Sequence, residues 1–215
     1  MKTFFRMILA LSVGGLTPVL AASPGSEVPG FFRTWLATQQ KTGDVRVDFG
    51  LSKTLPALKE PVKSSGRFWN YADGRFLWET GKPPSAVLRY NGAILESWEA
   101  EENKWRKLDP NDRRMRVWMN FLSGKRLTEE SLLKDFQVLP NPPAAEKPLA
   151  KMILEPRSTR ERKELKQLEL TFDTAEQRLV QIIVRQGDGG TQQMDFGKPK
   201  RMTAADLAAV PAAAK

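Results

Sequence analysis

Residues 66–78, GRFWNYADGRFLW, decide the fold, because they read as two aromatic-rich strands joined by a tight turn at Asp73-Gly74. Such a turn needs positive φ, which glycine adopts without steric cost. Side chains alternate between the two faces of a strand, so Phe76 and Trp78 share one face while Trp69 lies on the other. A hairpin with large apolar groups on both faces must be covered on both sides, or must present one side to an apolar ligand.

The chain around this hairpin predicts an antiparallel sheet. Asn91-Gly92 is a second strong hairpin turn, and no helical spacing interrupts the strands between the first hairpin and residue 108. The last third of the chain returns to alternating patterns after a proline-rich connection at 140–148. The strands expected from alternation and turn residues are 44–49, 63–71, 75–80, 85–90, 93–99, 104–108, 150–155, 166–173, 178–185 and 191–197.

Three segments show helical spacing. Residues 28–40 carry an apolar stripe that includes Leu36, which indicates a helix lying on the sheet. Residues 109–124 begin with a capping Asp109 and Pro110 and carry a second apolar stripe. Thr128 is expected to cap a short helix that follows. The stripe of the middle segment consists of Met115, Trp118, Met119 and Leu122.

The two ends of the chain are expected to lie outside the folded domain. Lys2 and Arg6 precede an apolar stretch too short to span a bilayer, and Ala21 and Ala22 fit a small-residue cleavage rule. Residues 1–22 therefore read as a removed signal peptide, and the mature protein is expected in the periplasm. Residues 23–197 form one predicted domain, and the alanine-rich residues 198–215 are expected to be a flexible tail or at most a short helix.

Composition excludes several classes of site. The chain contains no His and no Cys, which removes the commonest general base, cysteine nucleophiles and the usual zinc ligands. The net charge is +9, and removal of Lys2 and Arg6 leaves +7. This charge favours anionic partners or is simply a solubilising surface; nucleic acid is not expected outside the cytoplasm. A carboxylate pair, as in glycan hydrolysis, is the remaining enzymatic alternative, with Glu79, Glu96, Glu99, Asp109 and Asp112 as candidates.

The order and spacing of several short motifs resemble the periplasmic lipoprotein carrier family, LolA, and its LolA-like relatives. The resemblance covers residues 28–197. Its motifs are Gln39-Gln40-Lys41, Gly66-Arg-Phe-Trp69, Phe76 with Trp78, Asn91-Gly92, Leu154-Glu-Pro156, Leu168-x-Leu-x-Phe-Asp173 and Asp188-x-Gly190 leading to Phe196. The chain departs from the family at Ala72-Asp73, where the best-known carriers have a basic residue followed by proline. A hydrophobic cargo is therefore expected more firmly than a lipoprotein.

The resemblance implies a mainly β fold with helices, in which a strongly curved antiparallel half-barrel has its concave face covered by helices around an apolar cavity. It implies a monomeric, non-enzymatic carrier without a cofactor. Such a carrier receives the acyl chains of a lipoprotein or similar acyl lipid from an inner-membrane transporter and passes them to an outer-membrane acceptor. A sensor or regulatory lipid-binding module on the same fold is the alternative.

The residues expected to line the cavity are aromatic and aliphatic. Phe76 and Trp78 match aromatic residues of the family's second hairpin strand, and residues 115–122 match a segment that covers the cavity. Ordinary core packing is the alternative for all of them. The full set is Phe76, Trp78, Phe68, Trp69, Leu36, Trp98, Met115, Trp118, Met119 and Leu122.

Overall fold

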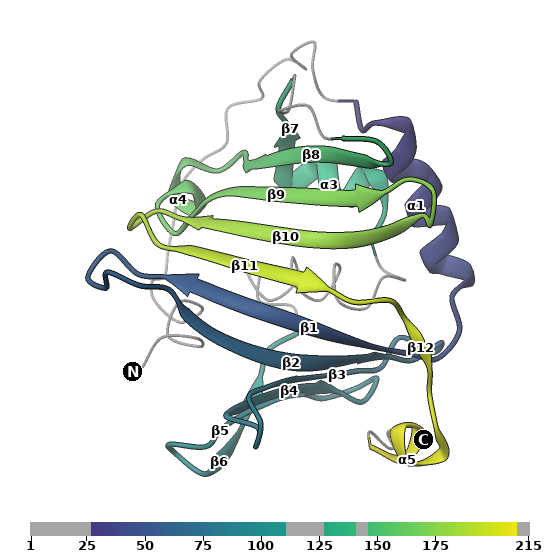
Figure 1. Ribbon diagram of the computed structural model, residues 1–215, viewed down its shortest axis with the longest axis vertical. Helices are drawn as coiled ribbons and strands as arrows, with labels where there is room; N and C mark the ends of the chain where they lie inside the picture. Colours follow the sequence, from purple (N-terminus) through teal and green to yellow (C-terminus); the bar gives the residue numbers. More distant parts are fainter. Residues whose placement is uncertain (1–26, 111–126, 141–145, 210–215) are drawn as a thin grey trace.

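One antiparallel sheet carries the fold in the computed structural model, which describes residues 27–110, 127–140 and 146–209 (Figure 1). The strand order is β6-β5-β4-β3-β2-β1-β11-β10-β9-β8-β7, and β12 pairs with β1. The strands are β1 (Val45–Thr54), β2 (Val62–Asn70), β3 (Phe76–Thr80), β4 (Ala86–Tyr90), β5 (Leu95–Glu99), β6 (Lys104–Leu108), β7 (Phe136–Val138), β8 (Leu149–Pro156), β9 (Leu165–Asp173), β10 (Arg178–Gln186), β11 (Thr191–Phe196) and β12 (Lys200–Arg201).

The sheet consists of two meanders joined along a single pair of strands. Strands β1 to β6 follow one another in space as in sequence, and so do β7 to β11. The joint is the antiparallel pairing of β1 with β11, in which Phe49 lies opposite Phe196 and Thr54 opposite Thr191. The mainly β, antiparallel architecture expected from the sequence is confirmed. The order is open, with β6 and β7 at its two ends, so these strands do not form a closed or strongly curled barrel.

Both glycine turns predicted from the sequence are present. Gly74 has φ +89° and Gly92 has φ +99°, in the region that favours glycine. The amide of Tyr71 donates to the carbonyl oxygen of Arg75 across the first turn (3.0 Å). These turns fix the register of the opening hairpin, in which Phe68 lies opposite Trp78 and Trp69 opposite Leu77.

Strand β1 is longer than the alternation predicted. The sequence predicts a strand over 44–49, but β1 continues to Thr54. Its second half is held on both sides, because Leu51 lies opposite Ser64 of β2 and Met194 of β11. Tertiary pairing therefore extends a strand whose own residues are weakly patterned.

The sheet has two distinct faces. The inner face is defined here by the side chains that pack together with the helices α1 (Gly30–Lys41) and α3 (Glu129–Asp135). The outer face is the opposite side, where a smaller cluster contains Trp69, Tyr71 and Leu77. The inner-face core spans both meanders, and its strand residues include Phe49, Leu51, Phe76, Trp78, Leu88, Leu95, Met152, Leu168, Phe172, Ile182 and Met194.

The helices form where the sequence indicated. Pro29 precedes α1, which buries Phe32, Trp35 and Leu36 from the predicted stripe. Thr128 caps α3 as predicted: its hydroxyl accepts from the amide of Ser131 (3.0 Å), and the Ser131 hydroxyl accepts from the amide of Thr128. Two shorter helices are α4 (Thr159–Arg162) and α5 (Ala204–Ala208). None of the helices in the described ranges is long and apolar enough to cross a membrane.

Part of the C-terminal segment is structured, and it includes the short helix that the sequence allowed. Lys200–Arg201 pair with β1 as β12, and the short helix α5 lies against the outer face (Figure 1). Thr203 caps α5 through a reciprocal pair of bonds with Asp206. The physical reason is this cap, together with partners that lie far away in sequence and are described below. The predicted signal peptide, residues 1–22, lies outside the described residues.

Candidate functional site

A row of aromatic side chains crosses the inner face at the centre of the sheet. The ring of Phe49 on β1 lies 4.2 Å from that of Trp78 on β3, centroid to centroid. Phe68 lies 5.5 Å from Trp78, and Phe196 lies 6.0 Å from Phe49. The residues come from β1, β2, β3 and β11, so the row bridges the joint between the meanders. Phe76 extends it toward β4.

The closest contact in this row depends on Gly66. The Phe49 ring lies directly over Gly66, and a Cβ atom there would also meet the carbonyl oxygen of Glu79. Only hydrogen at this position lets the ring settle between β1 and β3. The missing side chain is therefore part of how the aromatic row is built.

A second aromatic cluster lies where α1 crosses the opposite meander. Trp35 and Phe31 lie 5.2 Å and 5.5 Å from Phe172 of β9, and Phe32 packs edge-on against the same ring at 5.9 Å. Phe172 is buried through these contacts. The periodic stripe of α1 and the alternating pattern of β9 thus meet at one ring, which ties the helix to the inner face.

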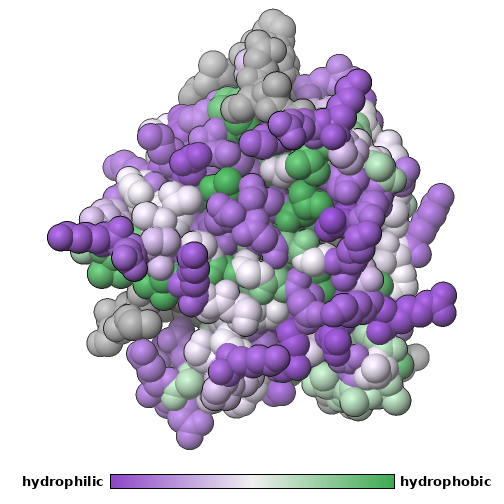
Figure 2. All heavy atoms as spheres, in the orientation of Figure 1, coloured by the Kyte–Doolittle hydropathy of each residue, from purple (hydrophilic) through white to green (hydrophobic). Residues whose placement is uncertain are grey.

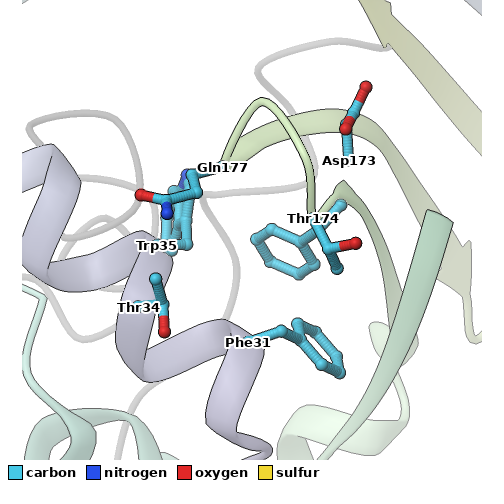
Figure 3. Close-up of a pocket in the computed structure, with 7 residues that line it drawn as sticks. Phe31, Thr34, Trp35, Asp173, Thr174 and Gln177 are labelled. Atoms are coloured by element: carbon cyan, nitrogen blue, oxygen red, sulfur yellow. The ribbon is translucent and has the colours of Figure 1, made fainter. Parts of the chain in front are cut away.

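A small cleft opens beside this second cluster. It has a volume of about 240 Å³ and a mixed lining, formed by Phe31, Thr34, Trp35, Phe172, Asp173, Thr174 and Gln177. In Figure 3, Trp35 of α1 is drawn beside Gln177, and Asp173 and Thr174 lie across from them. Trp35 is buried, and its indole N–H has no hydrogen-bond partner among the described residues. The cleft has room for a small apolar group.

The structure brings four of the predicted cavity residues together. Phe68, Phe76 and Trp78 stand in the aromatic row, and Leu36 joins the same inner-face core from α1. None of these four lines the cleft. The predicted residues Met115, Trp118, Met119 and Leu122 lie outside the described residues.

Trp69 and Trp98 lie on the outer face, apart from the other predicted residues. Trp69 is opposite Leu77, one position out of phase with Trp78, and Trp98 is opposite Trp105. Neither tryptophan faces the side on which α1 packs. Alternation within the strand accounts for both positions, because a one-residue offset reverses the face.

Asp206 of α5 is the centre of a polar network on the outer face. The indole N–H of Trp69 donates to the Asp206 carboxylate (2.6 Å), and Arg46 forms a salt bridge with it (3.1 Å). The hydroxyl of Tyr71 donates to the Asp206 carbonyl oxygen (2.7 Å). The hydrogen bond from Trp69, followed by those from Thr203, holds the pKa of Asp206 well below its ordinary value. The pattern Thr203-x-x-Asp206 is the sequence signal that would have indicated this anchor.

Two of the five carboxylates considered for glycan hydrolysis are held by cations. Glu79 pairs with Arg67 (2.7 Å), and Glu96 pairs with Arg89 (2.9 Å), both on the outer face. Glu99 is the charge that acts on Lys53, which lies on the inner face at the end of β1. Burial lowers the pKa of Lys53 to about 8, and Glu99 partly opposes this shift. Asp112 lies outside the described residues.

Comparison with known proteins finds likenesses of fold. No protein-family model matches the sequence, and no curated protein matches it either. The structure is similar to a LolA superfamily protein from Nitrosomonas europaea, with 10% identity over 81% of this chain and 95% of that chain, at a TM-score of 0.42. It is similar to LprF from Mycobacterium bovis, with 12% identity over 81% and 93% of the two chains, at 0.39. It is also similar to the Pseudomonas aeruginosa MucA/MucB complex, with 14% identity over 83% of this chain and 59% of that chain, at 0.37.

Proposed function

We propose that this protein is an exported carrier that holds the acyl chains of a lipoprotein, or of a similar acylated lipid, against the inner face of its sheet. The observation that supports this is the continuous apolar inner face, which runs through both meanders and carries an aromatic row at its centre. An apolar surface of this extent matches the chemistry of an acyl chain, which has no polar atoms to satisfy.

The edges of this face suit a ligand that is bound and later released. Several large apolar side chains pack against the buried core while remaining half-buried: Phe31, Phe68, Leu108, Leu133, Leu165, Leu179 and Phe196. Covering them with an acyl chain would gain about 0.8 kcal/mol for each buried CH₂ group. These side chains already pack partly against other residues of the protein. An acyl chain that covers them therefore gains only part of this free energy. An acceptor with a more open apolar site could then take the chain without ATP.

In this proposal the cargo lies on the inner face of the open sheet, and α1 and α3 cover it from that side. The protein works in the periplasm as a monomer. It receives acyl chains from an inner-membrane transporter and delivers them to an outer-membrane acceptor. Phe68, Phe76, Trp78 and Leu36 contact the chains, and no catalytic residue or cofactor takes part.

A matched pair of variants tests the proposal. Phe68→Asp places a charge on the inner face, whereas Trp98→Asp places one at a similarly half-buried aromatic position on the outer face of the same meander. We expect Phe68→Asp to weaken binding of an apolar fluorescent dye by at least about tenfold, since a buried unpaired charge is strongly unfavourable. Trp98→Asp should leave dye binding within twofold of the parent, and circular dichroism should show both variants folded.

The cargo itself is identified by mass spectrometry of lipids that co-purify with the protein taken gently from a periplasm. An acylated peptide or another defined acyl lipid, near one per protein, supports the proposal. A protein that is empty, ignores added lipids and shows equal dye binding in both variants contradicts it. That result would direct attention to protein partners and to a regulatory role.

A further inference from the structure

The connection between β1 and β2, together with the first residues of β2, forms an arm at one end of the sheet. The arm comprises residues 56–65, of which 62–65 belong to β2, and every one of them is exposed. Figure 1 shows this connection projecting from the sheet beside the β10–β11 turn. Pro56 and Pro61 lie within the arm and cannot donate a backbone hydrogen bond. The arm is therefore poorly suited to adding a strand from another protein.

Two large apolar side chains of the arm are open to solvent. Leu58 is 46% exposed and Val62 is 39% exposed. Single exposed apolar residues are common, but here two lie four residues apart on one projecting connection. Figure 2 shows hydrophobic and strongly hydrophilic residues side by side at this end of the molecule.

Cations accompany these apolar side chains. Lys59 follows Leu58 and Lys63 follows Val62, and Glu60 is the one acid of the arm. Within the described ranges, neither lysine is among the residues that form a salt bridge. The arm thus combines exposed apolar groups with a net positive charge.

One of the two neighbouring connections adds positive charge to this end of the sheet. Gly189 of the β10–β11 turn lies beside Pro56, and the amide of Gly187 donates to the carbonyl oxygen of Glu164 (3.0 Å). The segment that holds α4 is therefore at the same end of the sheet, and it carries Arg160, Arg162 and Lys163. The α4 segment also carries Glu161 and Glu164, Arg162 pairs with Glu155 (3.7 Å), and the β10–β11 turn carries Asp188. The arm and the α4 segment together keep a modest excess of positive charge at this end of the sheet.

The arm is continuous with the inner face. Val62 lies opposite Lys53 in the β1–β2 ladder, in phase with Leu51 and Phe49. An apolar track therefore runs from the exposed tip, past one lysine, to the aromatic row. A molecule leaving a bilayer at the tip would meet this track first.

We propose that the arm docks onto an anionic lipid bilayer, with Leu58 and Val62 entering the boundary between headgroups and acyl chains and Lys59 and Lys63 binding lipid phosphates. Exposed apolar groups beside lysines are the combination by which peripheral proteins bind such surfaces. This goes beyond carriage, because a carrier can exchange cargo with a protein donor without touching lipid.

The absence of cysteine from the sequence makes a direct test simple. Leu58→Cys, labelled with an environment-sensitive dye, should show blue-shifted emission with vesicles of phosphatidylcholine and phosphatidylglycerol. The matched control is Ile94→Cys, because Ile94 is 38% exposed and lies in the β4–β5 turn at the other end of the strands. Its emission should not change.

Affinity measurements by vesicle co-sedimentation test the two parts of the docking surface. Leu58→Asp should weaken binding by at least about tenfold, and Lys59→Glu or Lys63→Glu by at least about fivefold each. The controls Ile94→Asp and Lys41→Glu, the latter at the end of α1, should stay within twofold of the parent. Binding should weaken as salt is raised, because salt screens exposed charges.

The proposal is overturned if the parent ignores anionic vesicles, binds pure phosphatidylcholine equally well, or loses as much affinity in the control variants as in the arm variants. It is also overturned if the arm variants lose binding only to a purified membrane protein. The dye binding of Phe68→Asp reports separately on the inner face, so failure of docking and failure of carriage are distinguishable.

Discussion

Gly66 is the residue on which the aromatic row depends most directly. We expect Gly66→Ala to lower the free energy of unfolding by about 1–3 kcal/mol, because the new methyl group meets the Phe49 ring and the Glu79 carbonyl oxygen. Gly50→Ala on the adjacent strand is the matched control, since nothing lies within 4 Å of its Cβ position. Urea unfolding of both variants measures the difference. Equal midpoints would mean that the ring moves aside freely.

Lys53 should make stability depend on alkaline pH. Its pKa falls to about 8 in the folded chain, from an ordinary value of 10.5, because it is partly buried. Between these values the unfolded chain binds more protons than the folded one at this site, so its contribution to stability rises with pH. We expect Lys53→Met to remove that rise. Unfolding curves of parent and variant at pH 7, 8, 9 and 10 measure it, and a parallel pH dependence would contradict the assignment.

Residue-level prediction from sequence works where the signal is local. Gly74 and Gly92 were predicted to be turn glycines because Asp-Gly and Asn-Gly carry that information within two residues. The role of Gly66 could not be predicted, because the ring that needs the space belongs to Phe49 on another strand. Alternation alone predicts that Trp69 and Trp78 lie on opposite faces. The prediction that Trp69 and Trp98 line the same cavity as Phe76 did not follow this alternation.

At the scale of elements, α5 should depend on Asp206. We expect Asp206→Ala to lower stability by about 1–3 kcal/mol, because Trp69 and Arg46 lose their acceptor in a buried setting. The tail should then become sensitive to proteases, as limited proteolysis followed by mass spectrometry would show. Thr203→Ser, which keeps a capping hydroxyl, is the control. Similar protease resistance of the Asp206→Ala tail would contradict this anchor.

The same carboxylate gives an acid dependence. The pKa of Asp206 is lowered on folding, so its contribution to stability is fully present above its ordinary value of 3.8. It is lost as pH falls through the lower pKa of the folded state. The difference in unfolding free energy between the parent and Asp206→Asn should therefore shrink at pH values below 3.8. A difference that stays constant through this range would show that the charge is not what anchors α5.

Helices α1 and α3 were predictable, whereas the placement of α5 was not. The signals of the first two are local, because α1 has an apolar stripe and α3 is preceded by the capping Thr128. The anchors of α5 are Trp69, Tyr71 and Arg46, which lie far upstream. An alanine-rich segment carries no pattern that identifies such partners, so the sequence allowed a flexible tail or a short helix without placing either. The structure has the short helix α5, preceded by the strand β12, which the sequence did not predict.

At the scale of the whole molecule, one core serves both meanders. Residues of β1, β3, β4 and β5 and of β7 to β11 belong to the same buried cluster, together with α1 and α3, and Phe68 of β2 packs against it. We therefore expect a single cooperative transition, because neither meander can bury its inner face alone. Tryptophan fluorescence and far-ultraviolet circular dichroism should give coincident urea curves. Two separated transitions would show that the meanders are independent units.

The joint that makes this single core was the feature hardest to predict. The strands of the first meander were predicted as a run of neighbours from local turns and alternation. Strands β8 to β11 were predicted in the same way, whereas β7 was not predicted. The pairing of β1 with β11 connects residues at opposite ends of the domain, and no turn or motif between them indicates it. Pairing at such separation is a property of the assembled sheet.

This joint also sets an order of events during synthesis. Domains emerge N-terminus first, and β11 is made long after β1, so β1 waits with one side unpaired while β2 to β6 form beside it. Strand β1, which is central in the complete sheet, is thus an edge strand until β11 is made. During that time it could pair with another nascent chain. Arg46, Asp48 and Lys53 give β1 the charges that discourage such contact. After closure, Arg46 binds Asp206 and Asp48 binds Lys200, so the charges that protect the growing chain go on to fasten its C-terminal end.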